Sequence, residues 1–247
     1  MCTLVLAHRV VADLPLIVLA NRDEFLDRPA LPPGLIRSGP DVFGGLDEQA
    51  GGTWLGVNQH GLLVGLTNLA GTLPDPSRRS RGLLVMDLLT LRSAAEVHDA
   101  LSRIGRDACN PFRVIASDGI DALRARYDGA VALENLSPGV HAATNWREGS
   151  AGQDKRSRAE ARVRDALASA PEPAKLAGKL TLVGAHHDSD GDPHHSLCCH
   201  APGYSTRSSS IVLIGPSVAH WSHAEGPPCR TPYDDRSVAF RRVLHRP

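Results

Sequence analysis

The first 24 residues read MCTLVLAHRVVADLPLIVLANRDE and carry the strongest structural signal in the chain. Two runs rich in β-branched and other apolar residues, 2–10 and 16–20, flank a short connection at residues 12–15. Such runs on either side of a short link are typical of a β-hairpin. The sequence therefore predicts a hairpin that begins at Cys2 and ends in the polar tetrapeptide 21–24.

The rest of the chain moves from strand patterns to helix patterns and back. A proline-marked loop is expected at 29–40, a second hairpin at 51–57 and 61–67, and two helices at 80–88 and 93–104. Later strands are predicted at 112–116, 122–127, 140–144, 206–214 and 218–223, and later helices at 154–170 and 174–180. This order favours an α+β fold of layered sheets and helices over a parallel βαβ arrangement.

Composition narrows the class of protein. The 247 residues are 42% hydrophobic and 22% charged, which is typical of a globular protein with a buried core, and we expect one domain over residues 1–247. The 27 basic and 27 acidic residues leave no net charge, which argues against a nucleic-acid-binding protein. No apolar run reaches the ~18 residues of a membrane span. The absence of a signal-peptide pattern and the odd number of cysteines, five, predict a cytoplasmic location.

Cys2 directly follows the initiator methionine, so removal of Met1 would leave a thiol and a free α-amine on one residue. An α-amine has an ordinary pKa of about 7.7–8, so its neutral fraction can act as the base for the thiol near neutral pH. Cysteines are also common in buried strands. Taken alone, Cys2 therefore does not distinguish a nucleophile from a packing residue.

Several motifs follow Cys2 in order: NRDE at 21–24, RP at 28–29, GGTWLG at 51–56, LTN at 66–68 and SRG at 80–82. This set resembles the NRDE family, also called the transport-and-Golgi-organisation family, and the resemblance covers residues 1–82 closely. Beyond residue 82 the resemblance is limited to three short motifs, at 110–112, 144–145 and 206–209. The resemblance implies the N-terminal-nucleophile hydrolase fold, a four-layer αββα sandwich in which two antiparallel sheets lie between helical layers.

The chain is also similar to penicillin V acylases, bile-salt hydrolases and acyl-coenzyme A:6-aminopenicillanic acid acyltransferases, which likewise begin Met-Cys-Thr. In those enzymes the cysteine becomes the mature N-terminus and attacks an amide carbonyl. This wider resemblance implies that the catalytic residues are Cys2, Asp23, Asn68, Asn145 and Arg207.

These residue types suit one reaction. A nearby cation, Arg207 or Arg22, would lower the pKa of the Cys2 thiol. Asp23 would orient the α-amine. Asn68 and Asn145 would donate hydrogen bonds to the tetrahedral oxyanion, an effect of about 3 kcal/mol per donor.

Asn21, Arg22 and Trp54 are expected to contact the substrate. Asn21 and Trp54 also have purely structural explanations, because Asn and Asp favour turns, and Trp54 follows glycines that permit close backbone approach. Arg207 is equally suited to an ordinary ion pair. The motif at 80–82 is interpreted as a helix start without a chemical role.

The segment 186–200 contains five histidines, two cysteines and three aspartates, which are enough ligands for Zn²⁺. Adjacent His-His and Cys-Cys pairs chelate poorly, because neighbours on a strand point to opposite faces. Gly191 and Pro193 favour a solvated loop, and we expect no metal ion and no cofactor. The alternative is haem, whose iron Cys198, Cys199 or His200 would ligate.

The sequence thus predicts an N-terminal-cysteine hydrolase or acyltransferase that acts on a small-molecule amide or acyl thioester through a Cys2 thioester. The alternative, implied by the link of the NRDE family to haem trafficking, is a haem-binding protein on the same fold. The enzyme requires Cys2 free in a pocket beside Asp23 and Arg207, whereas the haem carrier requires an exposed apolar groove. A homo-oligomer is compatible with both.

Overall fold

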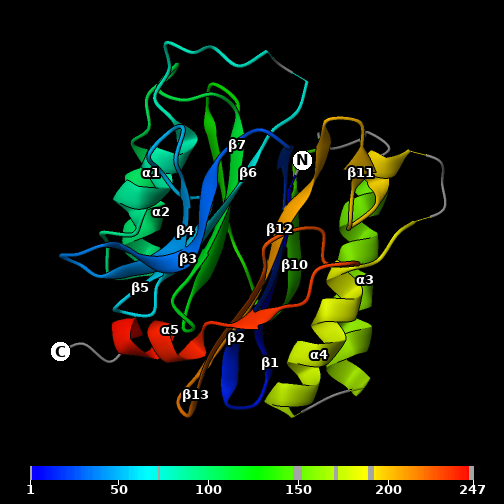
Figure 1. The fold of residues 1–247 in the computed structure, drawn as a ribbon. Helices are drawn as coiled ribbons and strands as arrows, with labels where there is room; N and C mark the ends of the chain where they lie inside the picture. The colour runs from blue at the N-terminus through cyan, green and yellow to red at the C-terminus, as the bar shows by residue number, and fades with distance from the viewer. Residues whose placement is uncertain (1, 72, 147–151, 170–171, 189–191, 245–247) are drawn as a thin grey trace.

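The computed structural model describes residues 2–71, 73–146, 152–169, 172–188 and 192–244. These residues form two seven-stranded sheets, and every strand pair within them is antiparallel. Figure 1 shows the two sheets face to face between helices, which confirms the expected α+β four-layer αββα sandwich. No helix in these residues is long and apolar enough to span a bilayer.

The first sheet contains the predicted N-terminal hairpin at its centre, in the order β10-β1-β2-β12-β13-β14 with β11 on β12. In this hairpin Thr3 lies opposite Asn21, and on the other side of β1 it lies opposite Thr144. The strands are β1 (Thr3–Val11), β2 (Leu14–Phe25), β10 (Gly139–Thr144), β11 (His200–Ala201), β12 (Tyr204–Gly215), β13 (Val218–Ala224) and β14 (Asp234–Asp235). The hairpin register therefore brings Cys2 beside both the 21–24 tetrapeptide and the end of β10.

The second sheet follows chain order from β3 to β9. Its strands are β3 (Ala30–Arg37), β4 (Val42–Asp47), β5 (Leu55–Asn58), β6 (Leu63–Asn68), β7 (Phe112–Ser117), β8 (Ala122–Tyr127) and β9 (Val131–Asn135). The prediction of a loop at 29–40 is wrong, because β3 occupies most of this segment. This edge strand carries Pro32 and Pro33 where its register shifts between Leu31 and Gly34, and prolines are tolerated at such irregular edge positions.

Helices cover the outer face of each sheet, as Figure 1 shows. α1 (Arg81–Leu88) and α2 (Ala94–Ser102) pack on the second sheet, and α3 (Gly152–Ser169) and α4 (Pro173–Gly184) pack on the first. A short 3-10 turn, η1 (Pro193–His195), precedes β11, and α5 (Ser237–Leu244) contributes Phe240 and Val243 to the core between the sheets.

The alternation of side chains along β1 and β2 determines where the polar residues point. Leu4 and Ala20 face the core between the sheets, whereas Val5 and Leu19 face α3 and α4. The same alternation, extended to the ends of the two strands, places the side chains of residues 2 and 22 between the sheets. Residues 21 and 23 are directed toward the helical layer.

Candidate active site

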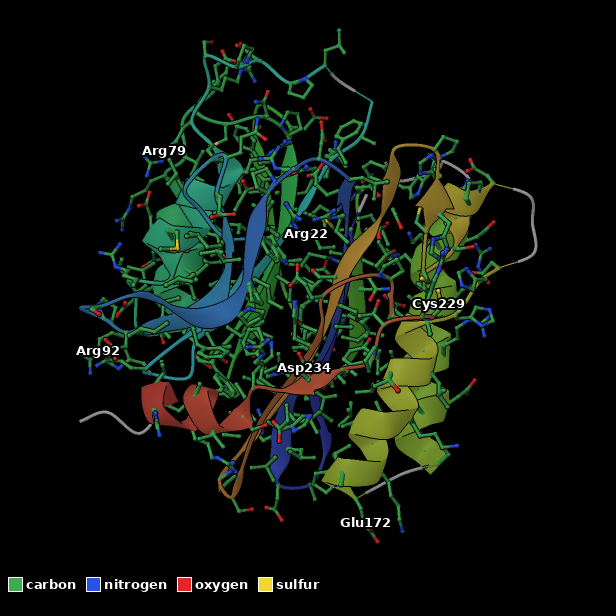
Figure 2. All side chains as sticks on the ribbon, in the orientation of Figure 1. Arg22, Arg79, Arg92, Glu172, Cys229 and Asp234 are labelled. Atoms are coloured by element: carbon green, nitrogen blue, oxygen red, sulfur yellow. The ribbon has the colours of Figure 1, made fainter. Side chains whose placement is uncertain are left out.

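A cavity of about 370 Å³ is lined by residues from both sheets, and Cys2 lies on its wall. Three other residues predicted from the sequence line the same cavity: Arg22, Trp54 and Asn68. They come from β2, from the turn before β5 and from the end of β6. The structure therefore brings residues from both sheets together around the Cys2 thiol. Figure 2 shows Arg22 between the two sheets.

Arg22 is only 5% exposed, so its positively charged guanidinium lies inside the protein. Two neighbouring side chains stabilise this buried charge. The guanidinium carbon lies 4.4 Å from the ring centroid of Trp54, within the range of a cation–π contact. Its Nη2 is 3.6 Å from Oδ2 of Asp47, a carboxylate that also accepts a 2.8 Å hydrogen bond from Nε of Arg28. Nη2 of Arg22 makes no hydrogen bond among the described residues, which leaves a buried donor beside the cavity.

Cys2 is partly buried, and its Sγ lies 3.9 Å from the backbone oxygen of Asp23. Burial raises the pKa of the Cys2 thiol above its ordinary value, and the negative charge of Asp23 acts in the same direction. The expected low-pKa thiolate is therefore not what this environment favours. A thiol in such an environment is a nucleophile only where a base can take its proton.

Asp23 lies behind Cys2 on the side of β2 that faces α3. Its Oδ1 accepts a 2.5 Å hydrogen bond from Oγ1 of Thr206, and its Oδ2 lies 3.6 Å from Nζ of Lys155. Both side chains of this ion pair are fully buried. Lys155 was not predicted as a site residue, although it precedes Ala159 by one helical turn on the buried face of α3. Extending the apolar stripe backward by one turn would have found it.

Arg81 is a second residue that the sequence analysis missed. It lines the Cys2 cavity at the start of α1, and its Nη1 donates a 3.0 Å hydrogen bond to the backbone oxygen of Pro111. Burial lowers the pKa of Arg81, and the negative charge of the Cys2 thiolate partly opposes that effect. The close approach of Gly52 to Gly82, where a Cβ on Gly52 would overlap backbone atoms, positions this end of α1.

The two asparagines differ in exposure. Asn68 is exposed at the end of β6 and lines the cavity. Asn145 is buried just after β10 and does not line the cavity, and its Oδ1 makes no hydrogen bond among the described residues. The backbone oxygen of Asn145 accepts a 2.7 Å hydrogen bond from the backbone N–H of Ala70, which links the segment after β6 to the segment after β10.

Asn21 and Arg207 do not line the Cys2 cavity. The amide of Asn21 donates to the backbone oxygens of Gly184 and Leu197 at 2.9 and 2.8 Å, so it connects β2 to the end of α4. Arg207 lies at the register shift in β12, and its Nη1 donates to the backbone oxygen of Leu26. The guanidinium groups of the cavity are instead supplied by Arg22, Arg81 and their neighbours.

Comparison with known proteins assigns the family. Residues 1–223 match the family Transport and Golgi organisation 2. The chain belongs to this family. It is 28% identical over 235 residues to the Transport and Golgi organization protein 2 homologs of Bos taurus and Homo sapiens, in each case across 81% of this chain and 82% of the relative. The family predicted from the 21–24 tetrapeptide and its accompanying motifs is thus confirmed.

Solved structures of amide-hydrolysing enzymes share the fold of this family member. Penicillin V acylase from Agrobacterium tumefaciens superposes with a TM-score of 0.58 at 13% identity, over 96% of this chain and 86% of that one. A Caenorhabditis elegans N-acylethanolamine-hydrolyzing acid amidase ortholog gives 0.54 at 11% identity, over 99% and 97%. The C2A mutant of the Clostridium perfringens conjugated bile acid hydrolase gives 0.54 at 12%, over 96% and 92%. The fold is that of the N-terminal-nucleophile hydrolases.

Proposed function

We propose that this member of the family is a cytoplasmic N-terminal-cysteine hydrolase or acyltransferase, with Cys2 as its nucleophile once Met1 is removed. The observation that carries the proposal is the position of Cys2. Its thiol lies on the wall of a cavity between the sheets, while Asp23 lies behind it on the same hairpin. Thiol, α-amine and carboxylate on adjacent strand ends are what an amine-assisted nucleophile needs.

In the proposed reaction the Cys2 sulfur attacks the carbonyl carbon of the substrate, and the thiol proton passes to the neutral α-amine. Asn68 supplies an amide N–H donor for the resulting oxyanion from the cavity wall. Asn145, which does not line the cavity, is assigned the second donor from the resemblance to the acylases, and each donor is worth about 3 kcal/mol when well aligned. The C–N bond then breaks, and the departing amine takes the proton from the α-ammonium. Water, or an acceptor amine, attacks the thioester and releases Cys2.

The charge of the cavity supports a substrate with an anionic group. Among the described residues, five arginines and three carboxylates line it. Arg78 and Arg79 are neutralised by Asp75 and Asp87, at 3.3 and 2.6 Å. Arg81 has no carboxylate partner in the described part of the chain, and guanidinium groups bind carboxylates through paired hydrogen bonds. We therefore favour a small N-acyl compound or acyl thioester that carries a carboxylate. This charged lining differs from the apolar groove that a haem carrier requires.

The direct test is the mass of the acyl-enzyme. Protein lacking Met1 is incubated with matched N-acyl amides and acyl thioesters, with and without a carboxylate. We expect an acyl adduct on Cys2, formed faster with the anionic compounds. Protein retaining Met1 should form none, because its α-amine is then an amide and cannot accept the proton. If no compound acylates Cys2 while hemin binds tightly in a Soret titration, the haem alternative is correct.

A further inference from the structure

Four metal-binding side chains meet near β11, away from the lining of the Cys2 cavity. One ligand atom from each of His187, Cys198, His200 and Cys229 lies within 4.8 Å of all the others. Nε2 of His200 is 3.2 Å from Sγ of Cys229 and 3.7 Å from Sγ of Cys198. With Zn–S of about 2.3 Å and Zn–N of about 2.0–2.1 Å, ligand atoms around tetrahedral zinc are separated by about 3.3–3.8 Å. The two separations from Nε2 of His200 are close to that range, and all six pairwise separations lie within 4.8 Å.

The four residues come from three separate segments. His187 follows α4, Cys198 and His200 flank the start of β11, and Cys229 lies in the loop between β13 and β14. Figure 2 shows Cys229 on the side of the molecule where α3 and α4 pack. The adjacent Cys199 contributes no ligand, because its Sγ approaches Nδ1 of His194 at 3.7 Å instead.

Neither His186–His187 nor Cys198–Cys199 lies in a strand, so the alternation of strand side chains does not apply to these pairs. Within each adjacent pair, one member, His187 or Cys198, reaches the cluster. The expectation of no metal ion rested on the histidine-rich segment alone, and Cys229, which lies outside that segment, supplies the fourth side chain of the cluster. Its loop is brought there by the pairing of β12 with β13.

Neighbouring groups favour ligation by Nε2 of His200. Oγ of Ser205 lies 3.4 Å from Nδ1 of His200 and donates its own proton to the backbone oxygen of Cys199 at 2.9 Å. It can therefore accept from Nδ1–H, which leaves the lone pair of Nε2 for a metal. The exposed Arg230 also lies 3.0 Å from Nδ1. Two donors cannot share that contact, so Arg230 must rotate away when metal binds.

We propose that His187, Cys198, His200 and Cys229 bind one Zn²⁺ ion in a tetrahedral structural site. The two thiols release their protons to solvent as two Zn–S bonds form, so the occupied site carries no net charge. Protein atoms fill all four positions, which is the arrangement of a structural zinc rather than a catalytic one. Two thiolates with two imidazoles select zinc over the harder Mg²⁺ or Ca²⁺.

The zinc would also support the geometry around Asp23. Cys199, between two of the ligands, donates its N–H to Oγ1 of Thr206 at 2.8 Å and accepts from the Thr206 N–H at 3.0 Å. Thr206 in turn donates to Asp23. A metal that holds residues 198–200 in place thus holds the partner of Asp23 in place.

The test measures Zn²⁺ uptake by the whole chain, stripped of metal by a chelator in the presence of a phosphine reductant. Competition with a chromophoric chelator should give one Zn²⁺ per chain, and Co²⁺ should give the visible bands of tetrahedral thiolate coordination. His187→Ala and Cys229→Ser remove exposed ligands and leave no internal cavity. Loss of a residue that only hydrogen-bonds to a metal ligand typically lowers metal affinity by about 10–100-fold. Each of these two substitutions removes a ligand itself, so each should lower the affinity for Zn²⁺ by more than that. His186→Ala is the matched control and should bind as the wild type does, while Arg230→Ala should bind at least as tightly.

Absence of stoichiometric Zn²⁺ uptake by the wild type would overturn the proposal, as would equal affinity in the two ligand variants and in His186→Ala. A Cys198–Cys229 disulfide in the freshly isolated protein, seen as the loss of two hydrogen masses, would also overturn it. Hemin binding that depends on these four residues, without zinc binding, would assign the cluster to iron instead.

Discussion

Cys2 on one side, and Cys198 with Cys229 on the other, lie in segments that adjoin strands of the first sheet, and the surroundings of these two groups of cysteines differ in kind. Cys2 borders a cavity and is accompanied by the guanidinium groups of Arg22 and Arg81. Cys198 and Cys229 are accompanied by imidazoles at ligand distance. A thiol that attacks a substrate needs open space and a place for its proton. Thiols that bind a metal need other ligands at fixed distances, so neighbours rather than burial separate the two roles.

The two centres are nevertheless connected through Asp23 and its partners. Nζ of Lys155 lies 3.6 Å from Asp23 and donates a 3.3 Å hydrogen bond to the backbone oxygen of His194, in the turn before the metal ligands. Thr206 joins Asp23 to Cys199 on the other side. The comparison therefore predicts separate chemistry at each centre and shared structural support between them.

The largest expected effect separates the chemistry. Cys2→Ser replaces the thiol with a far weaker acid and nucleophile, and should lower acyl turnover by about 10⁴-fold or more, the scale seen when a nucleophile is removed. Zn²⁺ stoichiometry should not change, because Cys2 is not a ligand. Turnover of the anionic N-acyl compounds and zinc content are measured on the same preparation.

Cys229→Ser is the reciprocal control. It should abolish tight zinc binding, while the acyl-enzyme adduct on Cys2 should still form. Turnover should fall only to the extent that loss of zinc displaces Thr206, which donates a hydrogen bond to Asp23. If both substitutions abolished both properties, the two groups of cysteines would form one site and the distinction between them would fail.

An intermediate effect concerns the shared support. Lys155→Met removes the cation of a fully buried ion pair and leaves the Asp23 carboxylate without it, which should lower the free energy of unfolding by about 3–5 kcal/mol. Lys175→Met is the matched control, because Lys175 is exposed and its ion pair with Glu172 contributes only about 0–1 kcal/mol. Both are measured by urea unfolding. A loss at Lys155 no greater than at Lys175 would show that the pair does not stabilise the fold.

The smallest effect tests the cation beside Cys2. Arg81→Gln removes a positive charge that favours the thiolate, so the already raised pKa of Cys2 should rise further. Below that pKa the thiolate fraction falls about tenfold per pKa unit, and alkylation of Cys2 by iodoacetamide at pH 7 should slow several-fold, up to about tenfold. Arg79→Gln on the same cavity, already paired with Asp87, should change the rate less. The rate is followed on the Cys2 peptide across pH; a rate unchanged in Arg81→Gln would remove Arg81 from the site.

Much of the fold was predictable because its determinants are local. The apolar runs of the N-terminal hairpin, the hairpin 51–67 and the amphipathic spacing of α3 each specify an element without reference to the rest of the chain. The strand β3 was missed because its prolines indicate a loop unless the strand is known to lie at a sheet edge. That position is a property of the assembled sheet.

The candidate site was predictable in part, for a related reason. Four of the predicted residues line one cavity because the registers of the hairpins fix their positions. Arg207 does not, because it lies at a register shift in β12 that cannot be predicted from the sequence. Lys155 was overlooked because a lysine on a helix is normally solvent-exposed. Cys229 was overlooked because its partnership with Cys198 depends on a contact between distant loops.

The last helix, α5, bears on where the protein can be shortened. Phe240 packs edge-to-face on Trp221 and at a tilt on Phe43, in a three-ring cluster whose centroids are 5.1 to 5.3 Å apart in the core between the sheets. The family match ends at residue 223, before this helix begins. A fragment cut at that boundary would keep every residue of the candidate active site and expose two aromatic rings to water. For expression and crystallisation, the usable boundary is therefore set by the core contacts of α5, and it lies beyond Val243.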